Sequence, residues 1–246
     1  MLSYEKKAFV RGVARRSGLA WPAHKNHSAR LLQRYEVDVV LDVGANNGQY
    51  GRELISMGWK RRLISFEPLS VAWQKLQANA RPHPNWFAEN MALGSTDGMA
   101  EINVSQNTQS SSFRDILPAH VSAAPTSAYV GTEEVRVARL DSVIDDYCLP
   151  EDRCFLKLDV QGFERDVLEG AEDSLARCVG LQAEMAVTPL YEGETLFTEM
   201  VEYLGSLGYI LMSIDGVFED EQTGQYAQLE GIFYRQEELE RLREGS

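Results

Sequence analysis

The sequence contains few cysteines and histidines and no long uninterrupted hydrophobic run. Its 246 residues include three cysteines, Cys148, Cys154 and Cys178, and four histidines. An odd number of cysteines without Cys-x-x-Cys spacing excludes a disulfide framework and a thiolate zinc site. We interpret all three as small buried apolar residues, and unpaired thiols predict a reducing, cytoplasmic setting.

Long apolar segments are also missing. No run approaches the roughly 20 residues that a membrane-spanning helix needs, so no transmembrane segment is expected. The N-terminal stretch MLSYEKKAFVRGVARRSGLAWPAHK has scattered basic residues and no continuous apolar part, which excludes a secretory signal.

Positive charge is scarce outside the N-terminus. The net charge is −13, yet residues 1–34 carry eight Lys and Arg against one acid, Glu5. The acidic remainder argues against nucleic-acid binding, which depends on clustered cations. We interpret the basic stretch as an amphipathic helix whose cations face water or the acidic body; contact with an anionic partner or lipid head groups is the alternative.

From Val37 onward, apolar strand-like runs alternate with amphipathic helical stretches, a pattern typical of a parallel sheet with crossover helices. A hairpin is predicted from 91–94 and 100–105, joined at Asp97-Gly98, and the polar segment 106–132 is predicted to be a functional lid or loop. The expected strands are 39–43, 62–66, 86–89, 135–139, 154–160, 180–185, 209–213 and 231–234. The expected helices are one ending at Pro22 and those at 28–35, 49–57, 70–80, 140–147, 163–175, 196–207 and 236–243.

These elements predict three parts. Residues 1–36 form an N-terminal helical extension, residues 37–235 a Rossmann-like α/β domain, and residues 236–246 a charged C-terminal helix and tail. A homodimer formed through the terminal helices is one possible assembly.

Four acidic residues fall at or near the ends of predicted strands, namely Asp42, Glu67, Asp159 and Glu184. In open α/β sheets, ligands bind outside the carboxyl ends of the strands. The sequence therefore predicts a binding site at this edge of the sheet. The alternative is that these acids only cap helices.

The turn 44–48 resembles a dinucleotide-binding fingerprint but has Asn46 where that fingerprint needs glycine. This argues against NAD or FAD and favours a ligand without phosphate, such as S-adenosylmethionine. Asp42 is expected to attract the ammonium group of that ligand, directly or through water, while the turn N–H groups favour its carboxylate. Glu67 is expected to accept both ribose hydroxyls.

Five motifs in order resemble the FkbM family of methyltransferases over residues 37–235. They are VLDVGANNGQYG (40–51), SFEP (65–68), ALGSTDG (92–98), SSSF (110–113) and LKLDVQGFE (156–164). The resemblance implies a class I methyltransferase fold with a mostly parallel seven-stranded sheet and helices on both faces. It also implies S-adenosylmethionine as methyl donor and a hydroxyl acceptor on a sugar, glycan or polyketide-like scaffold. Gln161 departs from the family, which often has an acid at this position.

The resemblance also implies roles for individual residues. Cofactor-binding residues would be Asp42, Gly44, Asn46, Gly48 and Glu67, with Asn90, Ala92 and Leu93 near the adenine. Ser111 and Ser112 would hold substrate or cover the site, and Lys157, Asp159 and Glu164 would face the reacting groups.

Asp159 is the expected general base, because a carboxylate at a strand tip can accept the proton of an attacking hydroxyl. Lys157 shares its strand face and would hold the developing alkoxide or keep Asp159 ionised; a structural ion pair is the alternative. His120 is a rival base, and Glu184 and Tyr191 are expected to line the acceptor pocket. Asp159, Glu164 and Glu184 together could coordinate Mg²⁺.

Two other functions stay open at this point. A non-catalytic scaffold that binds S-adenosylmethionine is favoured by Gln161 and opposed by Lys157 and Asp159. A nicotinamide-dependent oxidoreductase is opposed by Asn46 and by the lack of a Tyr-x-x-x-Lys pair.

Overall fold

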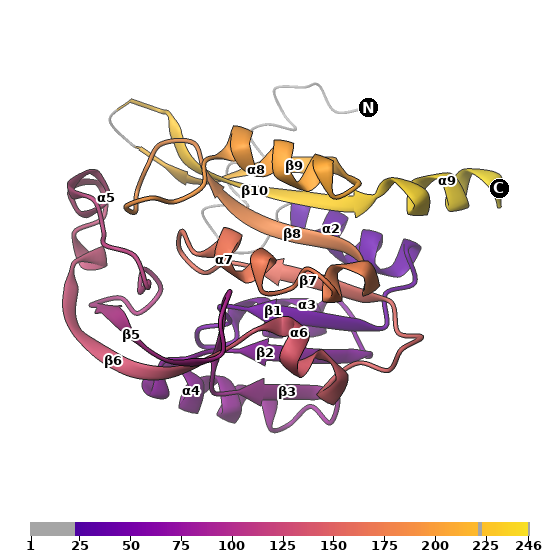
Figure 1. Cartoon of the computed structure of the whole chain (residues 1–246), viewed down its shortest axis with the longest axis horizontal. Helices are drawn as coiled ribbons and strands as arrows, with labels where there is room; N and C mark the ends of the chain where they lie inside the picture. The colour runs from indigo at the N-terminus through magenta and orange to yellow at the C-terminus, as the bar shows by residue number, and fades with distance from the viewer. Residues whose placement is uncertain (1–22, 221–222, 246) are drawn as a thin grey trace, which may run out of the picture.

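A seven-stranded sheet forms the centre of the computed structural model, which describes residues 23–220 and 223–245 (Figure 1). Its strand order is β3-β2-β1-β7-β8-β10-β9. β10 runs antiparallel to both neighbours, and the other paired strands are parallel. The strands are β1 (Val39–Val43), β2 (Arg62–Phe66), β3 (Trp86–Glu89), β7 (Cys154–Leu158), β8 (Cys178–Ala186), β9 (Tyr209–Glu219) and β10 (Tyr226–Arg235). This is the α/β class I methyltransferase arrangement that the sequence predicts.

Helices cover both faces of the sheet because its central strands are apolar on both sides. In β1 every residue is buried. Val39, Leu41 and Val43 pack with α6 (Leu140–Val143), α7 (Glu164–Glu169) and α8 (Phe197–Ser206). Val40 packs on the other side with α2 (Ala23–Arg34), α3 (Gln49–Ser56) and α4 (Ser70–Ala80). Alternation therefore places Asp42 on the α2–α3 side of the sheet.

A second, smaller sheet corrects one prediction. β4 (Ala92–Leu93) and β5 (Gly98–Ser105) do not form a hairpin with each other, because β6 (Tyr129–Ala138) lies between them in the order β4-β6-β5. β6 pairs antiparallel with β5 and parallel with β4. Residues 106–128 therefore join two paired strands and contain α5 (Pro118–Ala123) and a 3₁₀ turn, Pro125–Ser127, whereas residues 129–132 of the predicted loop belong to β6.

The helix predicted over 163–175 is interrupted. α7 ends at Glu169, and the chain passes through a turn into a 3₁₀ helix, Ser174–Arg177. A Cβ at Gly170 would lie 1.9 Å from the carbonyl oxygen of Gly94, so the close approach of these two backbones requires glycine. The helix predicted over 140–147 is likewise split, into α6 and a 3₁₀ helix, Ile144–Asp146.

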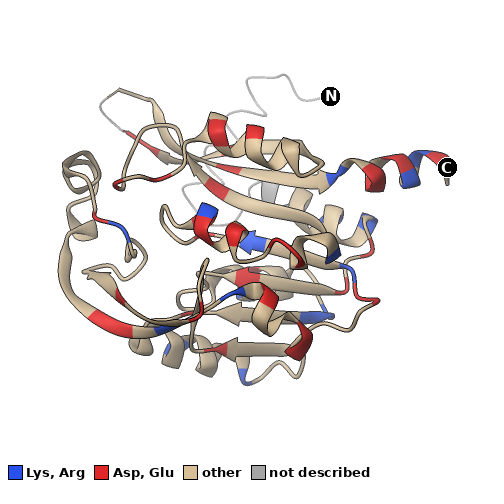
Figure 2. Ribbon diagram, viewed as in Figure 1, with Lys and Arg blue, Asp and Glu red and all other residues tan. Residues whose placement is uncertain are grey.

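The predicted N-terminal extension and the C-terminal helix lie at the two ends of the chain. The helix predicted to end at Pro22 lies outside the described residues, so the boundary of the N-terminal extension stays a prediction. α9 (Gln236–Glu244) follows β10 and is joined to the body by an ion pair of 2.5 Å between Glu238 and Arg153. Figure 2 shows both signs of charge along α9, whereas acidic residues are spread over many elements of the body.

All three cysteines are buried in the apolar core, as predicted. Within the described ranges, no helix combines the length and the apolar character that a membrane crossing requires.

Candidate active site

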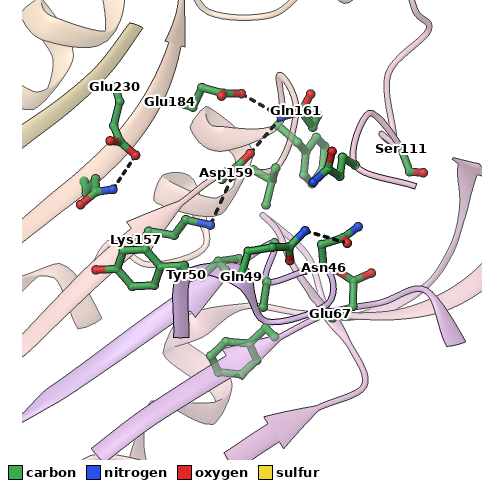
Figure 3. A pocket seen from close by; sticks show the side chains of 18 of the residues that line it. Asn46, Gln49, Tyr50, Glu67, Ser111, Lys157, Asp159, Gln161, Glu184 and Glu230 are labelled. Atoms are coloured by element: carbon green, nitrogen blue, oxygen red, sulfur yellow. Dashed lines mark hydrogen bonds and ion pairs between the residues drawn. The ribbon is translucent and has the colours of Figure 1, made fainter. Parts of the chain in front are cut away.

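A cavity of about 400 Å³ opens at the carboxyl ends of the central strands. Its walls come from the turn after β1, the start of α3, the end of β2, β4, residues 108–113, the end of β7, and interior residues of β8, β9 and β10. Figure 3 shows Asn46, Glu67 and Ser111 at one end of this cavity, and Glu184 and Glu230 at the other. Asp159 lies between the two ends.

The turn after β1 is fixed by its backbone. Gly44 has φ +76°, and a Cβ there would lie 1.9 Å from the carbonyl oxygen of Asp159, so only glycine fits. Asn46 has φ +47°, a left-handed conformation that asparagine adopts more readily than most residues. Its side-chain oxygen accepts the N–H of Asn47 at 2.8 Å, and its side-chain nitrogen donates to Thr108 at 3.2 Å. Asn46 therefore ties the turn to the long segment that covers the site.

Glu67 lies at the end of β2 and faces the same turn. Its two carboxylate oxygens accept the backbone N–H groups of Asn46, at 2.8 Å, and Leu69, at 2.9 Å. Burial raises the pKa of Glu67 to about 7, although both hydrogen bonds act in the opposite direction. A buried carboxylate aimed into a cavity from a strand end suits the recognition of paired hydroxyl groups.

Asp42 lies beneath the cavity and does not line it. It is fully buried, and one of its oxygens accepts a hydrogen bond of 2.8 Å from Ser65. Its other oxygen forms an ion pair of 3.2 Å with the Lys157 ammonium, because Asp42 and Lys157 are register partners on β1 and β7. The structure thus places Asp42 in a buried ion pair beneath the cavity, and its contact with the cofactor, directly or through water, stays a prediction.

Lys157 connects this buried pair to the cavity. Its ammonium also lies 3.4 Å from Asp159 and 5.5 Å from the centre of the Tyr50 ring. Burial alone would lower the pKa of Lys157, but the carboxylates of Asp159 and Asp42 outweigh it and raise the pKa above its ordinary value. Lys157 therefore stays protonated and cannot serve as a base.

Asp159 is the more exposed partner of Lys157. Its side chain is 40% exposed, against 6% for that of Lys157. One oxygen faces the ammonium, and the other accepts a hydrogen bond of 2.9 Å from the side-chain amide of Gln161. The structure thus places Asp159 at the cavity surface with both oxygens oriented.

The same Gln161 amide reaches Glu184, at 2.8 Å, and Gln228 donates to Glu184 at 2.8 Å as well. Burial, together with the negative charges of Asp159 and Glu164, raises the pKa of Glu184 well above its ordinary value. Glu184 lines the cavity on the side away from Glu67 (Figure 3).

Several predicted site residues do not reach the cavity. Glu164 turns back to accept the Val160 N–H at 2.9 Å, and burial raises its pKa to about 7. His120 is not a solvated loop residue: it is buried against Tyr191, 5.2 Å between ring centres, and burial lowers its pKa. Of the predicted site residues, those outside the cavity lining are Asp42, Gly48, Asn90, Ser112, Glu164, His120 and Tyr191, whereas Gly44, Asn46, Glu67, Ala92, Leu93, Ser111, Lys157, Asp159 and Glu184 line it.

Four of the residues outside the lining have clear structural contacts. A Cβ at Gly48 would lie 2.8 Å from the Trp86 ring. Asn90 donates to the backbone oxygen of Glu67 at 3.0 Å. Ser112 and Tyr191 instead hold Gln161, through its backbone and side-chain oxygens at 2.7 and 2.8 Å.

The magnesium prediction is not supported. Within the described part of the chain, no group of three or more His, Cys, Asp and Glu side chains is arranged to hold a metal ion. The physical reason lies in the hydrogen bonds, because Glu164 is engaged by backbone and Glu184 by two amide side chains.

Sequence reasoning missed much of the far wall. Gln182 donates to Glu230 at 2.6 Å and accepts from Ser28 at 3.2 Å, so that β8, β10 and α2 meet there. The sequence carried one signal for Gln182. Side chains two residues apart on a strand lie on the same face, so Gln182 shares a face with Glu184. The cavity residues not anticipated include Ser28, Gln49, Tyr50, Glu53, Gln182, Asp215 and Glu230.

Comparison with known proteins bears on this geometry. Residues 42–211 match the methyltransferase FkbM domain. The chain is 25% identical over 188 residues to the 2-O-methyltransferase NoeI of Sinorhizobium fredii. The aligned region covers 74% of this chain and 77% of NoeI. It is 27% identical over 168 residues to the AMB antimetabolite synthetase AmbE of Pseudomonas aeruginosa, covering 55% of this chain but only 8% of AmbE.

Solved structures are more distant. An rRNA methylase from Streptococcus thermophilus is 14% identical, with a TM-score of 0.47, over 88% of this chain and 98% of that one. Fibrillarin from Aeropyrum pernix, solved with natively bound S-adenosyl-L-methionine, is 12% identical, with a TM-score of 0.45, over 80% and 66%. Both scores are low, so neither likeness bears on the activity. The domain match spans most of the chain and includes the turn after β1, Glu67 and Asp159: the chain belongs to the FkbM family and is an S-adenosylmethionine-dependent methyltransferase.

Proposed function

We propose that this methyltransferase acts on oxygen, at a hydroxyl group of a sugar, a glycan or a similar polyhydroxylated natural product such as a polyketide. The observation that carries the proposal is Asp159, a partly exposed carboxylate on the cavity wall between Lys157 and Gln161. Such a carboxylate can accept the proton that a hydroxyl must lose as it attacks carbon.

The residues at the other end of the cavity fit the methyl donor. Glu67 points into the cavity, and an acid at this position suits the ribose hydroxyls. Leu93 and Phe163 supply apolar wall that suits the flat face of adenine. Gly44 lets the turn after β1 pack closely against the Asp159 backbone. The N–H groups that begin α3 favour the carboxylate of the methyl donor. Bound S-adenosylmethionine supplies an activated methyl group on a sulfonium sulfur.

The chain's own groups then divide the remaining work. Asp159 accepts the hydroxyl proton, so that positive charge on the acceptor oxygen does not build up as the new carbon–oxygen bond forms. Lys157 stays protonated, and its ion pair with Asp159 holds the carboxylate in place. Alignment of the acceptor oxygen with the methyl carbon supplies much of the acceleration, on the order of 7–11 kcal/mol in well-oriented systems.

The far wall supports a polyhydroxylated acceptor. Gln182, Glu184 and Glu230 present amide and carboxylate groups to the cavity, and these bind hydroxyl groups well. Similarity to a protein named as a 2-O-methyltransferase supports oxygen as the methylated atom. We expect no nucleic-acid substrate, because the charged side chains that line the cavity, among the described residues, are acidic apart from Lys157. A cytoplasmic location, a homodimer and the division at residues 36 and 235 stay predictions.

A methyl-transfer assay tests the proposal. The purified protein is incubated with S-adenosylmethionine labelled on its methyl group and a panel of neutral sugars, amino sugars, oligosaccharides, macrolides and an RNA fragment. We expect label in a hydroxylated compound as a base-stable methyl ether. Label on nitrogen or on RNA would contradict the proposal. Tight cofactor binding without transfer to any compound would favour the scaffold alternative.

A further inference from the structure

Gln161 stands where the sequence departs from its family, and the structure gives this residue an unusual backbone. Its φ is +56°, which a residue with a side chain adopts only at a conformational cost. Gly162 follows with φ +89°. Ser112 donates to the Gln161 carbonyl oxygen at 2.7 Å, so the strained turn is held by the segment that covers the site.

The Gln161 side chain bridges two acidic side chains of the site. Its amide nitrogen donates to Asp159 at 2.9 Å and to Glu184 at 2.8 Å (Figure 3). Its amide oxygen accepts from the Tyr191 hydroxyl at 2.8 Å. The orientation of the amide follows from Asp159, because a carboxylate paired with the Lys157 ammonium accepts hydrogen bonds, so the amide nitrogen faces it.

This arrangement uses both amide protons on two carboxylates. A glutamate at position 161 has the same shape but, at most, one proton to donate. When ionised, it would place a negative charge beside that of Asp159 and would have no proton to donate to either neighbour. The other charges near this pair are Lys157, which faces Asp159 from β7, and Glu164 and Glu230, which act on Glu184 from α7 and β10.

We propose that Gln161 is a positioning residue for methyl transfer: its amide N–H groups hold Asp159 and Glu184 side by side, with Asp159 directed into the cavity, and the amide neither gains nor loses a proton in doing so. The proposal rests on the proposed role of Asp159 as proton acceptor. Gln161 acts through Asp159 and donates no proton to the acceptor.

Two substitutions separate charge from shape. In Gln161→Glu we expect methyl transfer to the acceptor found in the panel to fall roughly tenfold or more in kcat at pH 8, with cofactor affinity changed less than about threefold. The loss should shrink toward pH 6, because the introduced carboxyl group, once protonated, can again donate to one neighbour. Wild type has no titrating group at position 161 and should show no such recovery. Gln161→Met should lose activity without recovery at low pH.

A second measurement needs no acceptor. In protein labelled with ¹⁵N at glutamine side chains, the Gln161 amide signal is identified by its loss in Gln161→Met. Both of its protons should shift in Asp159→Asn and in Glu184→Gln. Gln228, which donates only to Glu184 of this pair, is the matched control and should respond to Glu184→Gln alone.

The outcomes distinguish the two proposals. A Gln161→Glu variant with the wild-type pH profile, or a Gln161 amide that ignores Asp159→Asn, overturns the positioning role and leaves the proposed function intact. Failure of wild type to methylate any hydroxyl overturns the proposed function, and the amide measurement then still decides whether the bridge exists. Cofactor binding by each variant shows that it is folded.

Discussion

Two aspartates at neighbouring strand ends have different surroundings, and therefore different expected roles. Asp42 is fully buried and neutralised by Lys157, whereas Asp159 shares the same lysine but is exposed to the cavity. Only Asp159 can meet an acceptor molecule. Lys157 is paired with it and has an elevated pKa, so we assign proton transfer to the carboxylate.

The substitution Asp159→Asn tests this assignment. It keeps the shape but removes the negative charge and the group that accepts a proton, so we expect turnover to fall by roughly 10²-fold or more. Cofactor affinity should stay within a few-fold, as measured by calorimetry. Asp145→Asn, at a side chain 89% exposed, is the control and should behave as wild type. Near-normal turnover in Asp159→Asn would remove this residue from the mechanism.

At the residue scale the sequence predicted which strand ends matter but not which way each side chain turns. Glu67 and Asp159 reach the cavity because their backbones lie at its rim. Glu164 belongs to the same motif as Asp159, yet its carboxylate closes its own turn on Val160. Such local hydrogen bonds depend on backbone geometry that no spacing rule encodes. The burial of His120 was not predicted, because it depends on contacts with distant Tyr191 and Phe218.

At the scale of elements, prediction succeeded where one strand or helix carries its own signal. Strands 39–43, 62–66 and 86–89 and helix 70–80 agree with the structure at both ends. It failed where pairing is between distant segments. The 91–105 hairpin is wrong because β6, about thirty residues later, inserts between its two arms, and an isolated Asp-Gly turn carries no information about that insertion.

Gly44 offers a test at this scale. Gly44→Ala combines an unfavourable φ with a clash against the Asp159 backbone, whereas Gly58→Ala meets the same kind of φ, +96°, with nothing within 4 Å. We expect Gly58→Ala to cost about 1 kcal/mol of unfolding free energy and Gly44→Ala about 3 kcal/mol or more. Urea unfolding measures both. Equal losses would show that the strand-one turn does not press against the end of β7.

At the scale of the whole molecule, buried acids couple stability to pH. Burial raises the pKa of Glu164 from its ordinary 4.5 to about 7 in the folded protein. Its stabilising contribution is therefore fully present below pH 4.5 and is lost as the pH rises through about 7, because the folded state holds the proton longer than the unfolded state. Glu67 acts with the same sign, and His120, with a lowered pKa, acts with the opposite sign below pH 6.5.

Comparison with Glu164→Gln isolates one group. Glutamine keeps an oxygen for the Val160 N–H but does not titrate. We expect the stability of wild type relative to Glu164→Gln, in cofactor-free protein, to decrease by about 2 kcal/mol between pH 4.5 and pH 8. Chemical unfolding at a series of pH values gives the difference directly. A difference that stays constant, or grows with pH, would contradict a raised pKa at Glu164.

The most direct measurement of the central claim is calorimetric titration of S-adenosylmethionine into the purified chain and into Glu67→Gln. We expect S-adenosylmethionine to bind wild type. Glu67→Gln should weaken this binding roughly tenfold or more, because a carboxylate acceptor of ribose hydroxyl groups is lost. Exposed Glu172→Gln is the control and should bind as wild type does. No heat of binding to wild type, or equal affinity in Glu67→Gln, would contradict the claim that this cavity holds the methyl donor between the strand-one turn and Glu67.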